Sequence, residues 1–68
     1  MSAVNIGELP IGRQLKVERV AAGISLTDLA GALGISAGHL SNLEAGKRTV
    51  SPEFVERARL AIKGRAAA

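Results

Sequence analysis

Two neighbouring residues, Ser41 and Asn42, carry side chains well suited to recognising a ligand through hydrogen bonds. The Asn42 amide presents a donor and an acceptor side by side, which matches the edge of adenine in the major groove of DNA. The Ser41 hydroxyl donates or accepts. We therefore expect both side chains to read bases if they lie together on an exposed helix.

The residues around this pair predict two short helices joined by a tight turn. Ala30 is small enough for two helices to approach closely, Gly34 suits a left-handed turn, and Ser36 suits the cap of the second helix. A helix held in this way fits the major groove of DNA. The apolar seam between the two helices is expected to consist of Leu29, Leu33, Leu40 and Leu43.

The outer face of segment 37–45 consists of small and polar residues at helical spacing. Ala37 is suited to touching a thymine methyl group, and Gly38 to allowing close approach without reading a base. His39 suits a contact with a phosphate or a base, although an exposed histidine without a role is an equally good interpretation. The predicted base-reading residues are Ala37, Gly38, His39, Ser41 and Asn42.

Cations flank this face in the sequence. Lys47 and Arg48 follow Gly46 in the loop after segment 37–45, where flexible cations suit contacts with phosphates. An earlier helix offers Arg13 and Lys16, although for Lys16 an ordinary solvated surface is an equally good interpretation. The predicted phosphate-binding residues are Arg13, Lys16, Thr27, Lys47, Arg48 and Thr49.

The pattern predicts one domain over residues 10–63, with an arm at 1–9 and a short tail at 64–68. Four helices are expected, at about 10–22, 25–33, 37–45 and 52–63. Pro10 suits the first turn of the first helix, Ser25 and Ser51 suit caps, and Gly64 is expected to end the fourth helix. The charges of that helix and tail are expected to form a solvated face: Glu53, Glu56, Arg57, Arg59, Lys63 and Arg65.

The composition argues against several classes of site. The 68 residues include no cysteine, one histidine (His39) and one aromatic residue, Phe54. We therefore expect no metal, no cofactor and no enzymatic activity, because neither a zinc ligand set nor a nucleophile with its base is present. The net charge of +3 and the isoelectric point near 10.2 favour a polyanionic partner. We expect no membrane span and no secretion signal, and a cytoplasmic, nucleoid-associated protein.

Several spaced motifs together resemble a known family. They are Ile11-Gly12-x-x-Leu15, Arg19, Gly23-Ile24-Ser25, Leu29-Ala30, Leu33-Gly34-Ile35-Ser36, Leu40-Ser41-x-Leu43-Glu44-x-Gly46-Lys47-Arg48 and Ser51-Pro52. From Ile11 to about Ile62 the chain resembles the phage repressor and Cro-type (XRE-like) helix-turn-helix family. This resemblance implies an all-α fold, a lambda-repressor-like bundle of four to five helices that docks segment 37–45 in the major groove as a dimer.

The resemblance also implies an ion pair between Arg19 and Glu44 that links the first helix to the third. Glu44 lies one turn after Leu40, which places it on the inward side. The alternative is that both side chains point to solvent and contribute little. At one position the chain departs from the family, since Leu26 stands where members commonly carry a glutamine that contacts phosphate.

These observations favour a sequence-specific regulator of transcription that binds double-stranded DNA, of the phage or plasmid repressor type. Its expected partner is an operator with an inverted repeat, bound by a homodimer that forms in solution or only on DNA. The alternative is an antitoxin-type or other protein-interaction module. In that case a protein partner would cover exposed apolar residues, namely Val4, Ile6, Leu9 and Val17.

Overall fold

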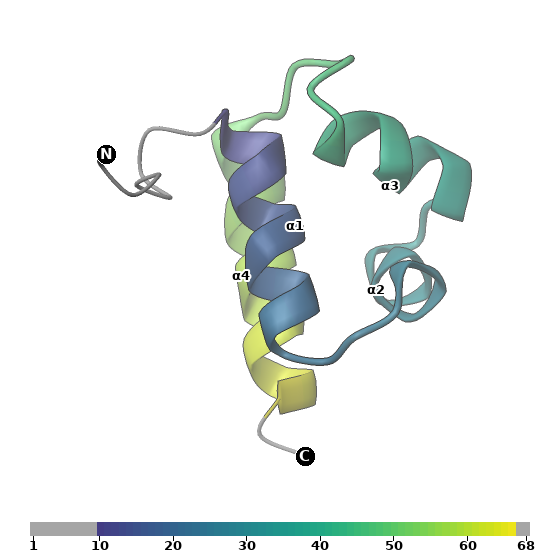
Figure 1. Cartoon of the computed structure of the whole chain (residues 1–68), viewed down its shortest axis with the longest axis vertical. Coiled ribbons are helices and arrows are strands. Elements are labelled where there is room, and N and C mark those ends of the chain that lie inside the picture. The colour runs from purple at the N-terminus through teal and green to yellow at the C-terminus, as the bar shows by residue number, and fades with distance from the viewer. Residues whose placement is uncertain (1–9, 67–68) are drawn as a thin grey trace, which may run out of the picture.

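The computed structural model describes residues 10–66 and contains four helices there (Figure 1). They are α1 (Ile11–Ala21), α2 (Leu26–Leu33), α3 (Ala37–Glu44) and α4 (Pro52–Ala66), and residues 10–66 include no strand. Helices α1 and α4 lie side by side and run in the same direction, while α2 and α3 lie together on one side of them (Figure 1). The expected all-α fold is confirmed.

Serine side chains begin three of the four helices. The hydroxyl oxygens of Ser25, Ser36 and Ser51 each accept a hydrogen bond from the backbone N–H three residues later, at 3.0, 3.0 and 3.1 Å. These bonds satisfy N–H groups that have no partner within the helix. Helix α1 has no side-chain cap. Pro10 does not lie in its first turn, as predicted, but precedes it as the N-cap, with φ −53° and a non-helical ψ of 146°.

A left-handed glycine makes the turn between α2 and α3. Gly34 has φ 71° and ψ 27°, a conformation that costs a residue with a side chain more than it costs glycine. The chain reversal lets the N–H of Ile35 donate to the carbonyl of Ala30 at 3.0 Å, which satisfies one of the last carbonyls of α2. This turn sets the angle at which α3 leaves α2, and so fixes the direction of its exposed face.

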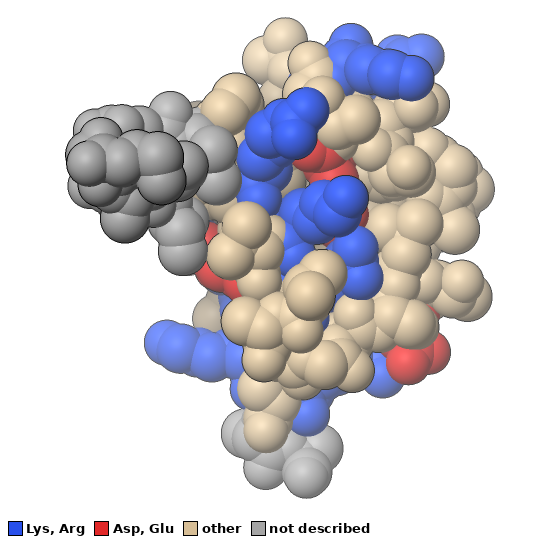
Figure 2. All heavy atoms as spheres, in the orientation of Figure 1, with Lys and Arg blue, Asp and Glu red and all other residues tan. Residues whose placement is uncertain are grey.

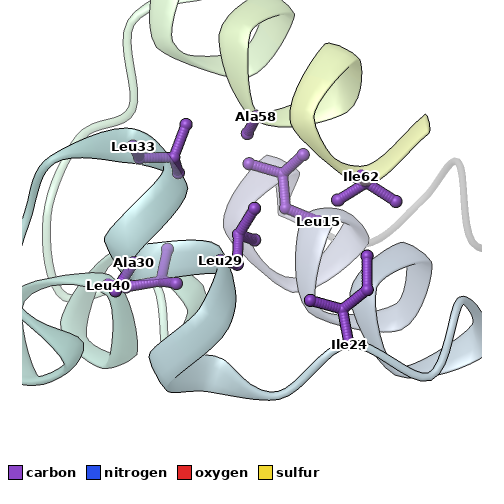
Figure 3. Close-up of a cluster of buried hydrophobic side chains, with 8 residues drawn as sticks. All are labelled: Leu15, Ile24, Leu29, Ala30, Leu33, Leu40, Ala58 and Ile62. Carbon is purple, nitrogen blue, oxygen red and sulfur yellow. The ribbon is translucent and has the colours of Figure 1, made fainter. Parts of the chain in front are cut away.

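All four helices contribute to one hydrophobic core (Figure 3). The predicted leucine seam between α2 and α3 is buried, and Leu29 and Leu40 have no measurable exposure. Ala30 is 2% exposed, and it lies beside Leu40 in Figure 3. The cluster consists of Leu15, Ile24, Leu29, Ala30, Leu33, Leu40, Ala58 and Ile62.

The predicted end of the last helix at Gly64 is wrong, because α4 continues to Ala66. Glycine ends a helix when the chain turns left-handed there. Gly64 is not among the described glycines with positive φ, so the helical hydrogen bonding passes through it. Residues 64–66 therefore belong to the helix and not to a tail.

On the predicted solvated face of α4, Arg57 and Arg59 are exposed but also contact neighbouring helices. Arg57 donates to the carbonyl of Leu33 at 3.2 Å, and Arg59 forms an ion pair with Glu18 at 3.0 Å and a hydrogen bond to Gln14 at 3.4 Å. Because α4 packs against both α1 and α2, these long side chains reach the neighbouring helices.

Candidate nucleic-acid interface

Helix α3 presents one face to the core and the opposite face to solvent. Leu40 and Leu43 are buried, whereas Gly38, Ser41 and Ala45 are exposed. The exposed residues are small, so the backbone of α3 lies close to the surface of the molecule. A narrow, uncharged helix face of this kind fits into a groove.

Two of the predicted base-reading residues are only partly accessible. Asn42 is half-buried, and Ala37 is half-buried because it packs against the hydrophobic core. Within residues 10–66 no hydrogen bond to the Asn42 amide is present, so its donor and acceptor groups are available to a ligand. His39 is exposed on the flank, and its backbone N–H donates to the Ser36 cap.

A buried ion pair joins α3 to α1. The Arg19 guanidinium donates from Nε to Oε2 of Glu44 at 2.8 Å and from Nη2 to Oε1 at 3.0 Å. Its third contact runs from Nη1 to the carbonyl of Ile24 at 2.9 Å. The hydrogen bond to Glu44 raises the pKa of Arg19, so the guanidinium keeps its charge. Arg19 and Glu44 are 8% and 4% exposed, so each charge is compensated by the other and not by water.

A close backbone approach also links α1 and α3. A Cβ atom added to Gly12 would overlap the backbone carbonyl oxygen of Leu43. Gly12 belongs to one of the family motifs, but this role was not predicted from the sequence. A glycine inside a helical segment lowers helix stability, and this could have indicated a close packing contact.

Cations from α1 border the exposed face of α3. A hollow of about 190 Å³ lies between the first three helices, and Arg13 and Lys16 line it together with Ser41 of α3 and Ala45, the residue that follows α3. Figure 2 shows basic side chains gathered on this face of the molecule, over α1. The structure thus brings two predicted phosphate-binding residues next to the predicted reading helix.

The remaining predicted phosphate-binding residues lie at two other places around α3. Lys47, Arg48 and Thr49 are exposed in the loop between α3 and α4, and the Lys47 N–H donates to the carbonyl of Asn42 at 3.0 Å. Thr27 is exposed in the first turn of α2. The preceding Leu26 is half-buried and packs against the core, so it offers no polar group at that point.

Two further findings concern other kinds of site. Residues 10–66 contain no group of three His, Cys, Asp or Glu residues that could hold a metal ion. None of the helices described in this range has the length and apolar character needed to cross a membrane. Among the apolar residues of the protein-interaction alternative, Val17 lies at the surface of α1, whereas Val4, Ile6 and Leu9 lie outside the described residues.

Comparison with known proteins identifies the family. The helix-turn-helix domain family matches residues 10–59, a range that begins at Pro10, before α1, and ends within α4. The comparison finds no matching curated protein and no matching solved structure. The matched range contains the α2–α3 pair, its left-handed turn and the Arg19–Glu44 ion pair. The chain therefore belongs to the helix-turn-helix domain family.

Proposed function

We propose that this domain binds double-stranded DNA with sequence specificity and regulates transcription as a repressor of the phage or plasmid Cro type. One observation supports this more than any other: the exposed face of α3 is small and uncharged, and cations of α1 line the hollow beside it. Small side chains let a helix lie deep in the major groove, while cations bind the phosphates at its edge. A regulator of this kind acts on DNA in the cytoplasm.

Base reading is assigned to the exposed side of α3. The Asn42 amide forms a bidentate contact with adenine, and the Ser41 hydroxyl bonds a neighbouring base. Ala37 touches a thymine methyl group, Gly38 allows close approach, and His39 contacts a base or a phosphate at the flank. The free amide of Asn42 supports its place as the principal reader.

Phosphate binding is assigned to residues on three sides of α3. Lys47 and Arg48 lie in the loop that leaves this helix, and Arg13 and Lys16 lie across the hollow on α1. Thr27 and Thr49 add hydroxyl donors. Contacts of this kind set the position of the protein on the duplex and carry no sequence information of their own.

Two copies of the domain bind one operator. Their α3 helices enter successive major grooves on one side of the duplex, about 34–36 Å apart, so the operator is an inverted repeat. The two copies meet in solution or only on the DNA. Since each copy contributes the same contacts, the sequence of one half-site is repeated in the other.

The double substitution Ser41→Ala with Asn42→Ala tests this assignment. Loss of a bidentate contact costs about 1–3 kcal/mol of discrimination, which is roughly 5- to 150-fold between the preferred duplex and an unrelated one. The double variant should lose this preference and retain weak, salt-sensitive binding to every duplex. Equal loss of binding to both duplexes, with the melting temperature unchanged, would contradict base reading by these residues.

A further inference from the structure

An apolar hollow of about 530 Å³ lies where α4 runs beside α1. Val55, Ile62 and Ala66 contribute apolar surface to it, and Leu60 at its edge is 62% exposed. Leu60 is the most exposed large hydrophobic residue within residues 10–66, ahead of Val20 at 57%. A protruding leucine next to an apolar hollow is typical of a surface that binds another protein.

This hollow lies on the opposite side of α1 from the proposed reading face. Glu18 lines the α4 hollow, whereas Lys16 lines the hollow shared with Ser41 of α3. Two residues along an α-helix turn by about 200°, so the two hollows lie on nearly opposite sides of α1. Whatever occupies the α4 hollow leaves the exposed face of α3 free.

The charges around the α4 hollow are balanced. Its rim carries two acidic residues, Glu18 and Glu56, and two basic residues, Arg59 and Lys63. The whole chain has a net charge of +3, so two copies repel each other over most of their surfaces. A neutral rim is a place where two copies meet without that repulsion.

Along α4 the charges are also ordered in a self-complementary way. Glu56 lies four residues before Leu60 and Lys63 three residues after it, so all three share one exposed face. If two α4 helices pack antiparallel with their centres between Arg59 and Leu60, Glu56 of each copy lies opposite Lys63 of the other. The same patch then serves both copies, as twofold symmetry requires.

We infer that the α4 hollow binds a second copy of this chain, with the two α4 helices antiparallel and each Leu60 seated in the hollow of the other copy. The contact is small, since it involves one helix and one hollow per copy, so it belongs to the weak, reversible class of interfaces. The two α3 helices then face away from each other. On the proposed DNA-binding function, such a pair holds two duplex segments, which is a contact different from the one on an inverted repeat.

The molar mass of the DNA-free protein tests this inference directly. Sedimentation equilibrium from about 10 µM to about 1 mM should show the mass rising from 7.0 kDa towards twice that value, as expected for a weak interface. Leu60→Asp should raise the dissociation constant at least tenfold. Val20→Asp places the same charge at a similarly exposed residue of α1 and should leave the dissociation constant unchanged.

A charge exchange tests the antiparallel geometry. Glu56→Lys and Lys63→Glu should each weaken association, whereas the double variant restores the opposite pairing between copies and should recover most of the original dissociation constant. These two residues are seven apart on α4, too far for the pair to form within one helix. A double variant that associates less well than either single variant would overturn the geometry.

Two other results would overturn the inference as a whole. One is a mass of 7.0 kDa over the entire concentration range. The other is a Leu60→Asp variant that melts at a lower temperature but has the same mass distribution. Leu60 would then stabilise its own chain and not the contact between copies. Both results are obtained without DNA, so they are distinguishable from a failure of the proposed DNA binding.

Discussion

Replacing Glu44 with alanine should destabilise the domain severely. Arg19 is only 8% exposed. Without Glu44, the hydrogen bond to the carbonyl of Ile24 is the one contact that remains to its guanidinium within residues 10–66. Removing one partner of a buried ion pair costs about 3–5 kcal/mol. A domain of this size has a free energy of unfolding of roughly 3–10 kcal/mol, at about 0.05–0.15 kcal/mol per residue. The variant therefore loses at least about a third of its stability.

Thermal unfolding followed by circular dichroism measures this loss. In a small domain each kcal/mol shifts the melting temperature by about 4–8 °C, so Glu44→Ala should lower it by at least about 12 °C. The matched control is Glu18→Ala, which removes the carboxylate of the exposed ion pair between Glu18 and Arg59. The Arg59 side chain is 45% exposed and the Glu18 side chain 34%. That exposed pair contributes less than about 1 kcal/mol.

A second variant separates the charge from the packing. Replacing both Arg19 and Glu44 with apolar residues of similar volume, Arg19→Met with Glu44→Leu, removes the unpaired buried charge along with the pair. Such replacements are often neutral or stabilising, so the double variant should melt well above Glu44→Ala. If Glu44→Ala and Glu18→Ala shift the melting temperature equally, the reasoning about burial is refuted.

The remaining predictions concern two glycines and four cations. Gly12→Ala should lower the free energy of unfolding by about 1–3 kcal/mol, because the added Cβ overlaps the Leu43 carbonyl. Gly31→Ala, with nothing within 4 Å of its added Cβ, should raise it by about 0.5–1 kcal/mol. Equal effects of the two substitutions on urea unfolding would exclude the close contact at Gly12. If Arg13, Lys16, Lys47 and Arg48 of two copies each contact phosphate, the log–log salt dependence of the binding constant should have a slope of about −7. Replacing Lys47 and Arg48 with alanine should bring this slope to about −4, and an unchanged slope would remove both from the phosphate contacts.

The local signals of the sequence were sufficient to predict the helices. Ser25, Ser36 and Ser51 cap through atoms three residues away, so their roles depend on neighbours that are visible in the sequence. Gly34 likewise acts through its own backbone angles. Gly64 shows the limit of this reasoning, because a glycine permits a left-handed turn without requiring one.

Contacts between distant residues were harder to predict. Arg57 and Arg59 bond to groups 24 and 41 residues away, and no spacing rule for a single helix relates them to those partners. The close approach of Gly12 to the backbone of α3 was equally hard to predict, because it depends on how the two helices pack. The Arg19–Glu44 pair, 25 residues apart, was expected from two signals: the chain resembles a family in which these positions pair, and Glu44 lies one turn after Leu40 on the inward side.

Among the candidate DNA contacts, some positions could be predicted from the sequence and others depend on packing. That Gly38 and Ser41 share an exposed face follows from helical periodicity. The half-burial of Ala37 and the hollow that unites Arg13 and Lys16 with α3 depend on how the helices pack, and the sequence alone carries no measure of that.

Selection of bound duplexes from a random library, at low ionic strength and followed by sequencing, tests the DNA-binding role of α3 most directly. The selected duplexes should share an inverted repeat with half-site centres about 34–36 Å apart, roughly one turn of the double helix. The Asn42→Ala protein should select duplexes with weaker preference at one position of each half-site. If the unaltered protein, folded by circular dichroism, enriches no sequence even at low salt, α3 does not read DNA.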